Sequence, residues 1–186
     1  MSFADVLLAL VIGLVGLMAT VVSIDSTRDL NNGSEYRSAA AHIGQKELER
    51  VRSLPYGSVL LDSAPATSTT PTDPGYHVTP GSPPAYRWDQ RAGGSTATAP
   101  LAIATGGVCT PGPCLSAAPT TWTDGRLGGK IYRYVSWVDD TACGVACPGT
   151  TDFKRVTVAV TENRDRPRQP VLVSTLVTDP EAKKGG

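Results

Sequence analysis

Apolar and polar positions are unevenly distributed at the start of the chain. Residues 6–24 form a run of uncharged, mostly apolar positions, which would extend about 28 Å as a helix. That length is close to the hydrocarbon thickness of a bilayer, which is about 30 Å. The pattern therefore predicts that residues 1–25 form a membrane or filament-core segment rather than part of a soluble core.

Residues 26–54 have a different pattern, with charged positions on one side and apolar ones at helical spacing. The apolar stripe consists of Tyr36, Ala40, Ile43, Leu48 and Val51. Pro55 ends the pattern, because a proline disfavours helical backbone at the preceding residue. The two segments together predict one long helix over residues 1–54, in which 26–54 is amphipathic.

An alternative is two separate helices joined near residues 29–34, because Asn31, Asn32 and Gly33 are poor helix formers. For one continuous helix, the weak points are Gly13, Gly16 and this polar stretch. We expect the helix to be intact in an isolated subunit and to unwind locally between Gly13 and Gly33 when subunits assemble.

Beyond the helix, alternation typical of β-strands predicts a globular domain over residues 55–186. The clearest segment is 153–162, where Val156, Val158 and Val160 share one face. Further strands are expected at 76–79, 85–90, 130–139 and 170–179. Such strands with short connections indicate an antiparallel sheet whose apolar face needs a cover. The predicted fold is therefore α+β, with the long N-terminal helix packed on an antiparallel sheet.

Charge and motifs exclude several functions. The chain has 17 Lys and Arg against 17 Asp and Glu, so a net charge of zero gives no reason to expect a nucleic-acid partner. It lacks the G-x-S-x-G, H-E-x-x-H and phosphate-loop patterns. We therefore expect no enzymatic activity, no cofactor and no metal site.

The four cysteines lie in two loops of the C-terminal half, at Cys109, Cys114, Cys143 and Cys147. Their spacing also fits a zinc site. Disulfides are favoured instead, because the apolar segment directs the domain out of the cytoplasm. Two local disulfides, Cys109–Cys114 and Cys143–Cys147, and cross-pairing between the loops are both open.

One acidic residue, Asp5, stands at the start of the apolar run with no basic residue before it. A secretory signal peptide would have a basic start and a shorter apolar core, so the segment does not fit that class. A carboxylate in apolar surroundings needs a partner. If many copies pack side by side, Asp5 of one copy can pair with the Met1 amine of its neighbour and set the register of the helices.

The segment MSFADVLLALVIGLVGL resembles the mature N-terminus of a type IV pilin or pseudopilin, in which an acidic residue occupies the fifth position. Met1 and Asp5 match the first residue and the acidic position of that family. Asp replaces the usual Glu, Met replaces the commoner Phe, and no leader is visible. The resemblance implies a processed and methylated first residue, an N-terminal helix anchored in the cytoplasmic membrane, and later incorporation into a filament.

The expected function is therefore a structural subunit of a type IV pilus-like extracellular filament. Its partners would be further copies of itself in a helical filament, the inner membrane before assembly and the pilus assembly machinery. A minor pilin, a secretion pseudopilin and a membrane-anchored binding domain that never polymerises are the alternatives. The last of these leaves Asp5 unexplained.

Overall fold

A computed structural model describes most of the chain, and the backbone divides into two compact units, Met1–Ser38 and Ala39–Gly186. The described residues are 3–81, 86–89, 98–110, 112–138, 153–163 and 168–179. The longest element is helix α1, Phe3–Arg52, which begins in the first unit and ends in the second.

Helix α1 ends through several local interactions. Arg50 and Arg52 lie in its last turn, where cations interact favourably with the negative end of the helix dipole. The Ser53 hydroxyl donates a 2.7 Å hydrogen bond to the Arg50 carbonyl, and the Leu54 amide donates to the Val51 carbonyl at 3.0 Å. These bonds satisfy carbonyls that a helix end leaves unpaired, and Pro55 follows directly.

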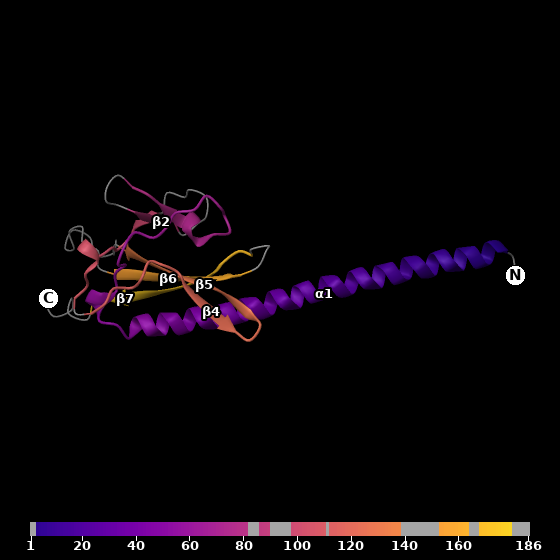
Figure 1. Ribbon diagram of the computed structural model, residues 1–186, viewed down its shortest axis with the longest axis horizontal. Coiled ribbons are helices and arrows are strands. Elements are labelled where there is room, and N and C mark those ends of the chain that lie inside the picture. The colour runs from indigo at the N-terminus through magenta and orange to yellow at the C-terminus, as the bar shows by residue number, and fades with distance from the viewer. Residues whose placement is uncertain are drawn as a thin grey trace. The chain divides into compact units, whose positions relative to one another are not determined.

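The second unit is built on a four-stranded antiparallel sheet in the order β4–β5–β6–β7. Figure 1 labels its four strands. The strands are β4 (Thr120–Asp124), β5 (Leu127–Val138), β6 (Phe153–Glu162) and β7 (Val171–Thr178). Strand β6 pairs with β5 along its whole length and with β7 from Phe153 to Val160. The tight turn between β4 and β5 contains Gly125 at φ 56°, in the left-handed region that glycine tolerates best.

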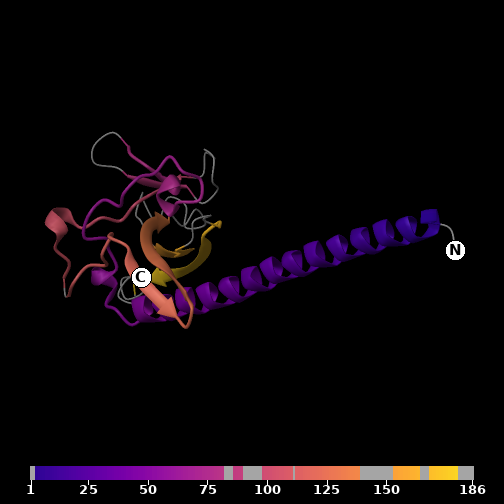
Figure 2. The ribbon, with the colours of Figure 1, turned by 45° about the vertical axis from the view of Figure 1, so that its right-hand side comes forward.

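Residues 39–52 of α1 cover one face of this sheet (Figure 2). Register places Arg133 opposite Val158 and Val158 opposite Val173, so these side chains share a face. Gly44 lies directly over that face, because a Cβ at this position would come within 2.5 Å of the Val173 side chain. The core between helix and sheet includes Ala40, Leu48, Val51, Ile131, Val135, Val156, Val158 and Val160.

A smaller antiparallel sheet contacts β5 and consists of β1 (Val78–Thr79), β2 (Arg87–Asp89) and β3 (Thr98–Pro100). Its main contribution to the core is Trp88, which is 1% exposed. The Trp88 ring stacks on Tyr134 of β5 at 4.1 Å between centroids and on His77 at 5.0 Å. The described residues also form three short 3₁₀ helices, η1 (Tyr56–Ser58), η2 (Pro74–His77) and η3 (Thr105–Gly107).

The predicted fold, a long N-terminal helix packed on one antiparallel sheet, is wrong. The described residues contain two antiparallel sheets with seven strands, and only residues 39–52 of α1 belong to the unit that contains them. The physical reason is one of size. A helix of 50 residues extends about 75 Å, more than twice the roughly 33 Å length of the ten-residue strand β6, so only part of it can lie on the sheet. The other face of the sheet is partly covered by the small sheet. Strands were predicted near β1 and β2, but not that they form a separate sheet with β3.

Candidate assembly surface

The first part of α1 exposes large apolar side chains to an unusual degree. Among the side chains that the structure describes there, eight have between 56% and 80% of their surface exposed: Phe3, Leu10, Val11, Ile12, Leu14, Val15, Leu17 and Met18. Successive helical residues are rotated by about 100°, so a nearly continuous run from position 10 to 18 is apolar on all sides. A helix of that kind is normally buried, either in a larger assembly or in lipid.

The energy available from covering this segment is large. Full burial of one Leu, Ile, Val, Phe or Met side chain contributes about 1.5–3 kcal/mol. Eight partly exposed side chains therefore amount to something on the order of 10 kcal/mol. That is comparable with the whole unfolding free energy of an ordinary domain, about 5–15 kcal/mol. Leaving this surface in water is consequently unfavourable, and the segment has a strong tendency to associate.

Two small features suit this segment to close helix packing. A Cβ placed on Gly13 would meet nothing within 4 Å, so the backbone there is open to a neighbouring helix. The Thr20 hydroxyl donates a 2.7 Å hydrogen bond to the Leu17 carbonyl, so its polar group is satisfied within the helix. The surface thus has an open backbone position and a hydroxyl that needs no outside partner.

The predicted assembly residues are only partly described. Met1 lies outside the described residues. The backbone of Asp5 is part of helix α1, but its side chain is outside the described part of the structure. Pairing between them in adjacent copies stays a prediction. The helix is continuous from Gly13 to Gly33 in this single chain, and the expected unwinding concerns an assembled filament.

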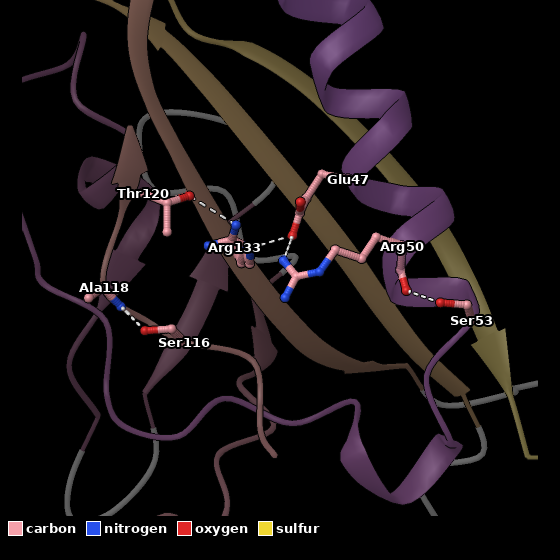
Figure 3. Close-up of polar contacts among 7 residues, drawn as sticks. All are labelled: Glu47, Arg50, Ser53, Ser116, Ala118, Thr120 and Arg133. Atoms are coloured by element: carbon pink, nitrogen blue, oxygen red, sulfur yellow. Dashed lines mark hydrogen bonds and ion pairs between the residues drawn. The ribbon is translucent and has the colours of Figure 1, made fainter. Parts of the chain in front are cut away.

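In the second unit, a buried ion pair fixes α1 to the sheet (Figure 3). Glu47 Oε1 accepts hydrogen bonds from Arg133 Nε at 2.6 Å and from Arg50 Nη1 at 2.9 Å. Arg133 also donates from Nη2 to the Thr120 hydroxyl at 2.9 Å. The side chains of Glu47 and Arg133 are 11% and 5% exposed, so this is an ion pair removed from solvent. The sequence pattern did not predict this ion pair, although Glu47 lies at the edge of the apolar stripe and Arg133 alternates with apolar residues.

Further polar contacts hold the end of α1 and the loop that follows it. The Arg52 guanidinium donates to the Thr175 hydroxyl on β7. Lys154 Nζ donates to the Tyr56 carbonyl at 2.8 Å and lies over the rings of Tyr56 and Trp137, 3.9 and 5.1 Å from their centroids. Burial lowers the pKa of Lys154, and the aromatic faces offset part of the cost of burying its charge.

Of the four cysteines, Cys109 and Cys114 form a disulfide with a Cα–Cα distance of 5.3 Å. Cys143 and Cys147 lie outside the described residues, so their local pairing stays a prediction. Because Cys109 and Cys114 are bonded to each other, neither is cross-paired with a cysteine of the other loop. Within the described ranges, no group of three or more His, Cys, Asp or Glu side chains is arranged to hold a metal ion.

Comparison of the chain with models of protein families, with curated proteins and with solved structures finds no match in any of the three. In the part of the chain that the structure describes, no helix meets the combined length and apolarity of a membrane span.

Proposed function

We propose that this chain is a structural subunit of a type IV pilus-like extracellular filament that assembles through the apolar first part of α1. The observation that carries the proposal is the exposure of Phe3 and of seven large apolar side chains between positions 10 and 18 on all sides of one helix. Packing such helices side by side with further copies buries this surface. The N-terminal sequence adds support through its resemblance to pilins, on Met1 and Asp5.

In this proposal the second unit is the globular domain that forms the outer part of the filament. Residues 39–52 of α1 are held to the sheet by an apolar core and by the Glu47–Arg133 ion pair. The disulfide between Cys109 and Cys114 suits an oxidising compartment. In this proposal Asp5 pairs with the Met1 amine of the next copy, and the membrane holds the subunit before the assembly machinery incorporates it.

The test compares one substitution at two similarly exposed valines. Val15 lies in the apolar segment and is 62% exposed, whereas Val108 lies in a loop of the second unit and is 72% exposed. We expect Val15→Asp to reduce the yield of filaments sheared from cells by about tenfold or more, because an unpaired carboxylate in an apolar interface costs more than 1.4 kcal/mol. Val108→Asp should leave the yield within about twofold of the parent chain.

Subunit levels in the membrane fraction are measured in parallel, so that loss of protein is separated from loss of assembly. Mass spectrometry of the filaments reports the abundance of the chain and the chemical state of Met1. Normal filaments from Val15→Asp would overturn the proposal. A chain found in membranes and never in filaments would favour the alternative, a membrane-anchored binding domain.

A further inference from the structure

A cleft that combines apolar surface with polar side chains lies on the second unit, between the loop at residues 70–74 and the paired ends of β5 and β6. Its volume is about 240 Å³, and its lining includes Asp73, Lys130, Tyr132, Thr161 and Asn163. Strand alternation places Lys130, Tyr132 and Thr161 on the sheet face opposite to the one that α1 covers. The cleft therefore belongs to the second unit, whereas the apolar segment that carries the proposed assembly belongs to the first.

The loop wall of the cleft is held in place by its own hydrogen bonds. Asp73 Oδ1 accepts a 2.7 Å bond from the Gly75 amide and caps helix η2. The Asp73 amide donates to the Thr70 carbonyl at 2.9 Å, and the Tyr76 amide donates to the Asp73 carbonyl at 3.0 Å. One carboxylate oxygen of Asp73 is used for the cap, so the position of the other is fixed before any ligand arrives.

The sheet wall is equally well ordered. The Asn163 amide donates to the Gly128 carbonyl at 2.9 Å, which continues the pairing beyond the end of β6. The Trp122 indole donates to the Thr161 carbonyl at 3.1 Å. A Cβ on Gly129 would collide with that carbonyl, so the close approach of the two strands requires glycine here. Both walls are thus preformed, as binding sites for small molecules usually are.

The groups around the cleft combine donors and acceptors of both charges next to an aromatic ring. Asp73 supplies a carboxylate acceptor, Lys130 an ammonium donor, and Asn163 an amide that can both donate and accept. Burial and, to a smaller extent, the charge of Asp73 raise the pKa of Tyr132, which keeps its phenol neutral and able to donate. A half-buried phenol ring also offers a flat apolar surface for C–H groups.

We propose that this cleft binds one pyranose ring of a carbohydrate, with its hydroxyls on Asp73, Lys130 and Asn163 and its C–H face on Tyr132. A cleft of about 240 Å³ is smaller than the roughly 300–1,000 Å³ that drug-sized ligands occupy, so it fits a single ring. The carboxylate of Asp73 disfavours phosphate and other anions. The inference is independent of whether the chain polymerises.

The experiment measures saturation transfer by NMR from the full chain, in a detergent without a sugar head group, to free glucose, galactose, mannose and N-acetylglucosamine. We expect transfer to at least one of these sugars. Asp73→Asn retains a side-chain oxygen for the cap on Gly75 but removes the charge. It should weaken binding by about tenfold, because a charged acceptor forms a stronger hydrogen bond than a neutral amide oxygen does.

A matched pair of cation substitutions keeps the test decisive if Asp73→Asn fails to fold. Lys130 and Arg126 are both exposed, but only Lys130 lines the cleft, while Arg126 lies in the turn between β4 and β5. Lys130→Gln should lose most of the saturation transfer, and Arg126→Gln should retain it. Absence of transfer to every sugar tested, or equal transfer in Lys130→Gln and the parent chain, would overturn the inference.

Discussion

Glu47 on α1 and Arg133 on β5 are separated by 86 positions in sequence, yet Arg133 Nε donates a 2.6 Å hydrogen bond to Glu47 Oε1 in a buried site. The same oxygen also accepts from Arg50, whose side chain is 62% exposed. The site therefore contains one cation that is removed from water and one that is not. The two arginines should differ sharply in their contribution to stability.

We expect Glu47→Leu to lower the free energy of unfolding by about 3–5 kcal/mol, because it leaves the Arg133 charge buried without its partner. The double change Glu47→Leu with Arg133→Met should recover most of that loss, since two apolar side chains of similar volume replace the pair. Arg50→Ala, at the exposed position, should cost less than about 1 kcal/mol. Urea unfolding of the four proteins checks this, and equal losses for Arg50→Ala and Glu47→Leu would contradict it.

Two glycines of α1 give opposite predictions for the same substitution. A Cβ on Gly44 would come within 2.5 Å of Val173 Cγ2, whereas a Cβ on Gly13 would meet nothing within 4 Å. Gly44→Ala should reduce stability by about 1–3 kcal/mol through overpacking, which outweighs its gain of roughly 1 kcal/mol in helix propensity. Gly13→Ala should retain that gain without the clash. Helix content and thermal unfolding by circular dichroism measure both, and a stabilised Gly44→Ala would show that the helix moves away from β7 at little cost.

Acid sensitivity is predicted at Asp62. The Ala117 amide lies 2.9 Å from Asp62 Oδ1 and is the main cause of a lowered pKa for this carboxyl. A carboxyl with a lowered pKa in the folded state stabilises the protein above its unfolded-state pKa of about 3.9. This contribution is lost as the pH falls through the folded-state value.

We therefore expect Asp62→Asn to lower the unfolding midpoint at pH 6 and to differ less from the parent chain at pH 2.5. Thermal unfolding at both values measures the difference, and Asp124→Asn, at an exposed position at the end of β4, is the matched control. A gap between Asp62→Asn and the parent chain that is the same at both pH values would contradict this account of the Ala117 contact.

The buried amine of Lys154 should make the stability of the protein depend on pH in alkaline solution. Burial lowers its pKa in the folded state, so between that value and about 10.4 the unfolded chain binds more protons than the folded one. Stability contributed by Lys154 therefore rises with pH in this window. We expect the parent chain to gain stability relative to Lys154→Met between pH 7.5 and pH 10. Urea unfolding of both proteins at each pH measures this, and a relative loss would show that contacts of the charged form dominate.

Regular alternation made some strands predictable. Strand β6 occupies Phe153–Glu162, the range that was predicted, because valines recur at every second position. Strand β5 begins earlier than predicted, at Leu127, since Gly128 and Gly129 hide the pattern. Strands β3 and β4 were not predicted, because three to five residues between prolines, threonines and glycines show too little alternation.

The interactions that position the functional surfaces were harder to predict. Glu47 and Arg133 each stood out as a charge among apolar positions, but a single sequence does not show that two such residues meet. The cleft is formed by a loop and two strands, and its members Asp73, Lys130 and Asn163 are each ordinary surface residues in the sequence. Periodicity reports which face a residue occupies, not which distant segment covers it.

The order of synthesis gives the Glu47–Arg133 pair a further consequence. At about 5–20 residues per second, Arg133 is made roughly 4–17 s after Glu47. Throughout that interval, the face of α1 that packs on the sheet has been translated, while β5 is incomplete and strands β6 and β7 have not been made. The helix is therefore synthesised several seconds before the sheet on which it packs is complete. Any factor that shields nascent apolar surface can bind the helix during this time.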